Sequence, residues 1–253
     1  MGTFTSYSDV LPNPSNSIAY DGSSESANEG YVAGPGYASV RVESAFKTMK
    51  SMTNSGALIS RSKASHSFKV SITYNPLTET EFNTVYSFIL EKQGMLKPFF
   101  VPCPQYDESQ DTTLMGNSPQ ITFAVDNSLG YDAGVTKMLI DANGDATYSP
   151  VTDGQLRPGD LFTVTDSTDS NHKKAYKITR VETNTDYNSD EGQPDADQLR
   201  ISFVPPLQKD VSDNSTINYI NPKIKVISRS DTIQYTLGSN NLYSFSLSLD
   251  EVQ

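Results

Sequence analysis

The sequence contains no tryptophan and a single cysteine, Cys103, among its 253 residues. One cysteine cannot form a disulfide within the chain, which excludes a disulfide-stapled secreted module. Cys103 stands between two prolines without a flanking His, Lys or Arg to lower the pKa of its thiol, so we expect no cysteine nucleophile. The lack of tryptophan also argues against a sugar-binding cleft, where aromatic platforms are usual.

Long apolar runs are absent too. No stretch approaches the roughly 18 apolar residues of a membrane-spanning helix. The first residues, MGTFTSYSDVLPNP, lack a basic segment followed by an apolar core, so we expect no secretory signal. These absences predict a protein without a membrane partner.

Positive charge is scarce, since 19 Lys and Arg stand against 30 Asp and Glu, a net charge of −11. An acidic chain repels a phosphate backbone, which excludes a protein that clamps DNA. The two histidines, His66 and His172, are too few for a zinc site. No G-x-S-x-G, Walker or dinucleotide-binding glycine motif occurs. We therefore expect no enzyme, no cofactor, no metal and no small-molecule substrate, although the paired carboxylates of a glycosidase stay open because their pairing is spatial.

The chain is rich in Ser, Thr, Asn and Asp, with short apolar runs between turn signals and 14 Tyr and 11 Phe. This composition is too aromatic for a disordered chain and is typical of a mainly β protein. Residues 1–36 are poor in apolar runs and rich in Ser, Asn, Gly and Pro. We predict an extended N-terminal arm there, ordered only where it lies on a neighbour.

Residues 66–106 predict a strand, a helix and a second strand. His66 to Tyr74 alternate strictly between apolar and polar side chains, as in a half-buried strand. A helix is predicted over 78–93, the one convincing helix of the chain. The apolar triplet 99–101 between prolines predicts a short edge strand.

The predicted helix has both start and stop signals. Thr78 and Glu81 form a capping box, and Leu77 and Phe82 stand where a hydrophobic staple requires them. Gly94 supplies a left-handed C-terminal stop.

From residue 112 onwards, short strands alternate with turns without any helical pattern, which predicts a small β-barrel or β-sandwich over 112–227. Asn143-Gly144 predicts a hairpin between strands 137–140 and 146–148. The acidic loop 186–197 is interpreted as solvated rather than as a cation site. Alternation returns in the terminal strand 242–252, which needs a sheet to join. We therefore predict a discontinuous domain, 37–111 plus 228–253, interrupted by an inserted β domain.

Two stretches resemble the tail proteins of tailed bacteriophages. Residues 68–106, FKVSITYNPLTETEFNTVYSFILEKQGMLKPFFVPCPQY, are similar to the strand–helix–strand segment of minor tail and distal tail proteins. Residues 154–207, followed by the terminal YSFSLSLDEV, are similar to tail proteins that carry an inserted β domain. Together these stretches cover about half the chain.

The resemblance implies a tail-tube-like β-sandwich with one flanking helix. Copies of such a hub close into a ring, commonly a hexamer, around a channel through which DNA passes as cargo. Its partners would be further copies of itself and the other tail tube and baseplate proteins, and its location the virion tail, assembled in the host cytoplasm. Six aromatic residues are the candidates for core and subunit contacts: Phe82, Tyr86, Phe99, Phe100, Tyr243 and Phe245.

Two other functions stay open. One is a carbohydrate- or receptor-binding β-sandwich module of a tail tip. The other is a tail-associated hydrolase, for which no catalytic constellation is evident in the sequence.

Overall fold

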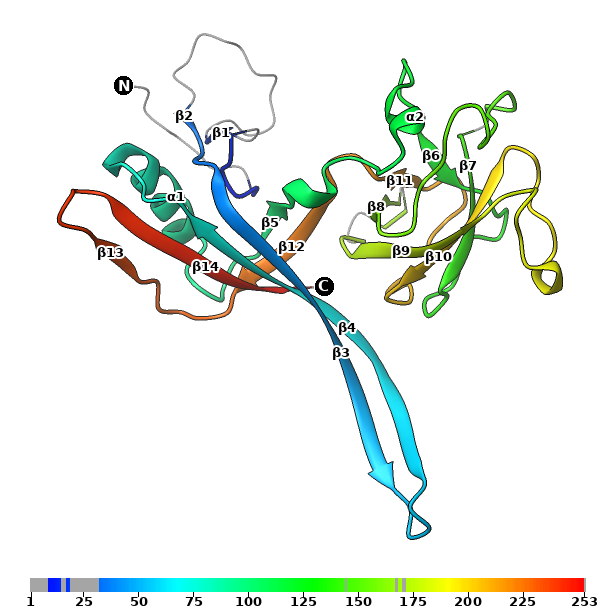
Figure 1. Ribbon diagram of the computed structural model, residues 1–253, viewed down its shortest axis with the longest axis horizontal. Helices are drawn as coiled ribbons and strands as arrows, with labels where there is room; N and C mark the ends of the chain where they lie inside the picture. The colour runs from blue at the N-terminus through cyan, green and yellow to red at the C-terminus, as the bar shows by residue number, and fades with distance from the viewer. Residues whose placement is uncertain are drawn as a thin grey trace. The chain divides into compact units, whose positions relative to one another are not determined.

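The computed structural model describes residues 9–14, 17–18, 32–143, 145–166, 168–169 and 172–252 (Figure 1). These residues are mainly β and include two α-helices, α1 (Glu79–Glu91) and α2 (Thr112–Met115), so the prediction of a mainly β fold is confirmed. Two compact units are present. The first comprises Met1–Phe46, His66–Pro102 and Lys225–Val252, and the second comprises Lys47–Ser65 and Cys103–Ile224.

The main sheet of the first unit has the strand order β3-β4-β14-β12-β5, and β13 pairs with the end of β14. Its strands are β3 (Tyr37–Met52), β4 (Leu58–Tyr74), β5 (Phe99–Pro102), β12 (Lys223–Ser228), β13 (Tyr235–Leu237) and β14 (Tyr243–Glu251). β14 therefore lies between β4 and β12, although it is the last strand in the chain.

The pairing of β14 with β4 follows from their alternating sequences. Leu249 stands opposite Val70 and Leu247 opposite Ile72, and all four side chains are buried. The serines between the leucines of β14 are exposed on the other face. Because the side-chain period of a strand is two, a slip of one residue would expose the whole apolar set, so the pattern fixes the register.

Helix α1, predicted over 78–93, spans Glu79–Glu91, with Thr78 as its N-cap and Lys92 as its C-cap. The carboxylate of Glu81 accepts hydrogen bonds from the Thr78 backbone N–H at 2.9 Å and from its hydroxyl at 2.8 Å. Leu77 and Phe82 are both buried, as the predicted staple requires. Gly94 adopts φ +65°, and a side chain there would meet Asp231 Oδ1 at 2.8 Å. Local signals are thus sufficient to place this helix.

One edge of the sheet is covered by the N-terminal segment. Val10 forms a parallel bridge with Phe100 of β5, and the Leu11 N–H donates to the Phe100 carbonyl at 2.8 Å. The buried ammonium of Lys92 contacts Asp9 Oδ1 at 2.9 Å. Most of the predicted arm, 1–36, lies outside the described residues, but this part of it lies on the predicted edge strand.

The opposite edge of the sheet is β3, with which only β4 pairs among the described strands. The turn of the β3–β4 hairpin is closed by a hydrogen bond from the Thr53 N–H to the Ala57 carbonyl at 2.9 Å. The two strands contain 16 and 17 residues and form one long ribbon, coloured blue to cyan in Figure 1.

The second unit contains a closed six-stranded barrel with the strand order β10-β7-β6-β11-β8-β9. The strands are β6 (Phe123–Val125), β7 (Lys137–Asp141), β8 (Leu161–Thr165), β9 (Ala175–Glu182), β10 (Gln198–Val204) and β11 (Thr216–Asn218). Rings of Phe123, Phe162, Tyr176 and Phe203 are buried in its interior. A barrel this small is filled by side chains and has no room for a ligand inside. Of the two architectures predicted for this segment, the barrel is the one present.

Two details of the predicted insertion need correction. β12 pairs with β14, so it belongs to the sheet of the first unit and the barrel segment ends near Ile224 rather than at 227. The predicted hairpin at Asn143 is absent, because β6 and β10 occupy both edges of β7. Residues 146–148 form a turn instead, and Tyr148 packs its ring 5.5 Å from that of Phe123. Gly144 itself lies outside the described residues.

The contact of the N-terminal segment with β5 can be tested with Leu11, which is fully buried. We expect Leu11→Ala to lower the free energy of unfolding of the first unit by about 2–4 kcal/mol, since truncating a buried leucine leaves a cavity. Urea denaturation followed by tyrosine fluorescence measures this. The matched control is Leu129→Ala, a leucine that is 94% exposed, for which a loss of the same size would contradict a specific role of Leu11.

Candidate functional site

The outer part of the β3–β4 hairpin carries large apolar side chains in solvent. They are 56–71% exposed although they lie on paired strands: Phe46, Met49, Met52, Leu58 and Ile59. Two-stranded hairpins of this kind are marginally stable in water on their own. A contiguous exposed apolar surface marks a site of interaction. We call residues 44–65 the hairpin arm.

Apolar side chains occur on both faces of the arm. Ser44 Oγ and His66 Nε2 are 2.6 Å apart across the two strands, and the ring of Phe46 lies 4.7 Å from that of His66, so these residues share a face. Because strand side chains alternate, Phe46, Met52 and Leu58 lie on this face and Met49 and Ile59 on the other.

The charge of the hairpin arm is opposite to that of the chain. The arm contains Lys47, Lys50, Arg61 and Lys63 and neither Asp nor Glu. The rest of the chain then holds 15 basic and 30 acidic residues, a net charge of −15. Lys47, Lys50 and Arg61 are exposed. A basic and apolar arm therefore belongs to an otherwise acidic protein.

The six aromatic candidates divide between core and surface. Phe82, Phe99 and Phe245 are buried, whereas Tyr86, Phe100 and Tyr243 are half-buried. Figure 1 shows α1 beside β13 and β14. The ring of Phe82 stacks on that of Tyr243 at 4.4 Å and on that of Tyr86 at 4.9 Å.

One further tyrosine belongs to this group. The ring of Tyr235, in β13, lies 4.8 Å from Phe82 and 5.4 Å from Tyr86, and Tyr235 is 48% exposed. The sequence analysis missed it. The aromatic rings of this cluster contact one another, so they hold α1 on the end of β14.

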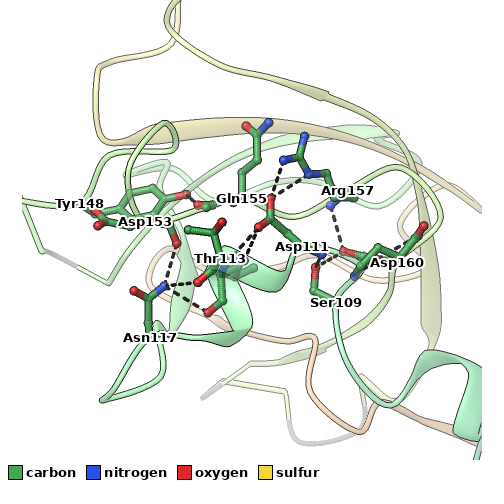
Figure 2. Close-up of polar contacts among 12 residues, drawn as sticks. Ser109, Asp111, Thr113, Asn117, Tyr148, Asp153, Gln155, Arg157 and Asp160 are labelled. Atoms are coloured by element: carbon green, nitrogen blue, oxygen red, sulfur yellow. Dashed lines mark hydrogen bonds and ion pairs between the residues drawn. The ribbon is translucent and has the colours of Figure 1, made fainter.

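A polar network joins the chain just before the barrel to the loop 153–160 of the barrel segment (Figure 2). Asp111 is its centre and is buried. Oδ1 accepts from the N–H groups of Thr113 and Leu114 and so caps α2. Oδ2 accepts from Arg157 Nε at 2.8 Å and from the Gln155 N–H at 3.4 Å. Helix α2 thus starts at a buried carboxylate.

A second buried carboxylate, Asp160, lies in the same network (Figure 2). Oδ2 accepts from the Ser109 hydroxyl at 2.5 Å and from the Arg157 N–H at 2.9 Å. Oδ1 accepts from the Gln110 N–H at 3.1 Å and from its side-chain amide at 3.2 Å. Gly154 allows the close approach, because a Cβ there would lie 2.4 Å from the Leu114 backbone nitrogen.

These carboxylates are saturated by protein donors. A general acid or base has to reach a proton of the substrate, which requires a free oxygen that faces a cavity. All four oxygens of Asp111 and Asp160 already accept hydrogen bonds from the chain. The network therefore acts as a structural staple, and the sequence missed it because its members are up to 51 residues apart.

Cys103 and His172, two side chains considered in the sequence analysis, are both buried. Burial raises the pKa of Cys103 to about 12, so its thiol stays protonated at neutral pH. The Nε2 of His172 lies 2.8 Å from the Tyr176 hydroxyl. Burial lowers the pKa of His172 more than the nearby Asp166 raises it.

The acidic loop 186–197 is largely exposed and includes the short 3-10 helix Ser189–Glu191. Its Glu191 forms an ion pair with Lys137, and Arg200 Nη2 donates to the Glu191 carbonyl at 3.0 Å. Within the described ranges, no group of three or more His, Cys, Asp or Glu side chains is arranged to hold a metal ion.

Comparison with protein-family models and with curated proteins finds no match to this chain. Among the helices of the described part of the chain, none is long and apolar enough to cross a membrane.

Replacing Asp111 tests the staple. We expect Asp111→Ala to cost about 2–3 kcal/mol in the free energy of unfolding of the barrel segment, because α2 loses its cap and several donors lose their acceptor. Thermal unfolding by circular dichroism measures this. Asp195→Ala, at an exposed position in the acidic loop, is the control. Equal losses in the two variants would contradict a structural role for the network.

The stability of the barrel should fall in acid through Asp166. Burial alone would raise the pKa of Asp166, but hydrogen bonds from the Ser212 N–H, the Thr168 N–H and the Thr168 hydroxyl outweigh burial and lower it to about 2. Since the folded-state pKa lies below the unfolded one, the stabilisation is complete at neutral pH and is lost as the pH falls through about 2.

We expect this carboxylate to contribute about 2 kcal/mol at neutral pH and little at pH about 2. Urea denaturation at both pH values, with Asp166→Asn as the comparison, measures it. A difference between the two proteins that does not change with pH would contradict the assignment.

Proposed function

We propose that this protein is a structural component of a bacteriophage tail. Copies form a ring, commonly of six subunits, at the junction of tail tube and baseplate or at the tail tip. The ring docks neighbouring tail proteins and leaves a channel for DNA. The observation that carries this proposal is the hairpin arm, a long ribbon with exposed apolar side chains on both faces. Such a surface serves assembly rather than chemistry.

The placement of the resembling stretches supports the proposal. Residues 68–106 supply the last seven of the 17 residues of β4 and all of α1 and β5, and the terminal stretch supplies β14, which pairs with β4. Residues 154–207 supply β8, β9 and β10 of the barrel. We further propose that the sheet and helix of the first unit correspond to the tail-tube-like β-sandwich with one flanking helix, and that the barrel projects as the inserted domain.

Electrostatics also favour a channel for DNA. A net charge of −11 repels the phosphate backbone, so DNA passes without adhering. The open edge of β3 offers backbone groups that a neighbouring subunit can pair with, as edge strands do in sheet completion.

The main alternative is a carbohydrate- or receptor-binding module of a tail tip. Its support is the surface aromatic cluster around Tyr235, which is 48% exposed. The ring of Phe82 stacks on those of Tyr243 and Tyr86, so one face of each of these two tyrosines is already covered. A tail-associated hydrolase is the weakest proposal, since all four carboxylate oxygens of Asp111 and Asp160 already accept hydrogen bonds from the chain.

Sedimentation velocity over a wide concentration range tests the proposal, together with immunogold labelling of tailed particles that carry this protein. We expect the purified protein to form a ring of defined mass, alone or on tail tubes, and the label to lie at one end of the tail. A protein that stays monomeric under all these conditions and binds a saccharide would contradict the ring and support the alternative.

A further inference from the structure

The hairpin arm differs from the rest of the molecule in charge and in exposure at once. It has four of the 19 basic residues and none of the 30 acidic ones, and five of its large apolar side chains lie more than half exposed. Neither property is needed for the sheet of the first unit, since His66 is the first buried side chain among those described along β4. What the arm binds can be argued from its charge and its two faces.

We propose that the hairpin arm docks on the acidic surface of a second copy of this chain. The proposal rests on the proposed ring and names the contact that would close it. The arm of each copy has a net charge of +4, and the rest of each copy has a net charge of −15. The arm of one copy is therefore attracted electrostatically to the body of another. The apolar side chains then provide the desolvated centre of the contact, with the lysines at its rim.

Contact between two arms is disfavoured by the same charges. Arm against arm would bring two sets of four positive charges together, and like charges across an interface are repulsive. Arm against body uses different surfaces on the two partners, which is a heterologous contact. Heterologous contacts form closed rings when the rotation between copies closes.

A lipid surface fits the arm less well. Interfacial elements have one apolar face and one polar face. On the arm, Phe46, Met52 and Leu58 share one face with Lys50, while Met49 and Ile59 share the other with Lys47 and Arg61. Both faces are mixed, so the partner has to cover both, as a protein groove or a neighbouring pair of subunits can.

Nucleic acid is disfavoured by the apolar content. Binding to phosphates uses the Lys and Arg side chains and would leave Met49, Met52, Leu58 and Ile59 in water. Since the rest of the chain is acidic, it would also oppose a phosphate backbone. An acidic protein surface can pair with the Lys and Arg side chains of the arm, and its contact can at the same time cover the apolar side chains.

The first test reverses charge on the arm. The test variant carries Lys47→Glu and Lys50→Glu in the arm. The control variant carries Lys97→Glu and Lys173→Glu, which make the same change of charge at exposed positions outside the arm. We expect the arm variant to raise the dissociation constant for self-association at least about tenfold and the control to change it less than about threefold, by analytical ultracentrifugation. Association of the wild type should weaken between about 0.05 M and about 0.5 M salt.

The second test removes apolar surface without changing charge. The double variant Met49→Ser with Ile59→Ser is compared with the double variant Leu96→Ser with Val151→Ser, whose positions lie outside the arm and are at least as exposed. We expect only the arm variant to lose self-association. All four positions are exposed, so the circular dichroism and melting temperature of both variants should match the wild type and show that folding is intact.

The outcomes separate this inference from the proposed function. A wild-type protein that never self-associates overturns both. A ring that forms equally well with both arm variants overturns the docking of the arm and leaves the ring standing. Loss of binding to phosphatidylserine vesicles or to duplex DNA in the arm variants, with self-association unchanged, overturns the second copy as the partner and assigns the arm to lipid or nucleic acid.

Discussion

The first unit depends on the insertion of β14 between β4 and β12. Leu247 and Leu249 complete the apolar layer that Val70 and Ile72 begin, and Phe245 joins the aromatic cluster under α1. The sheet cannot be completed without residues 243–251, since β14 lies between β4 and β12 and follows both of them in the sequence. The barrel in between has its own closed set of strands and its own core, so it can fold without that strand.

The features that the sequence predicted correctly are determined by neighbouring residues. Helix α1 could be placed because the Thr78–Glu81 box, the Leu77–Phe82 staple and Gly94 all lie within one short segment. The strand 66–74 and the terminal strand could be recognised because each buries one face and exposes the other. The assignment of both strands to one discontinuous domain required reasoning over a long distance, and their matching patterns allowed it.

The features that the sequence missed depend on distant residues or lack a burial pattern. The hairpin at Asn143 failed because strands far away in the sequence already occupy both edges of β7. The staple at Asp111 and Asp160 could not be seen because its members come from separated segments. The full length of β3 and β4 was missed since the outer arm buries neither face, and a strand without a buried face shows no alternation. The signal that was available was the charge of the arm, which is basic throughout in an acidic chain.

The account treats the hairpin arm as an element that is completed only by another subunit, and amide hydrogen exchange of residues 44–65 measures this most directly. Free two-stranded ribbons open readily, whereas covered ones are protected by their partner. We predict fast exchange of the arm amides in dilute, monomeric protein and slow exchange in the assembled ring, with β14 protected in both. Arm amides that exchange equally fast in monomer and ring, or are already protected in the monomer, would contradict the account.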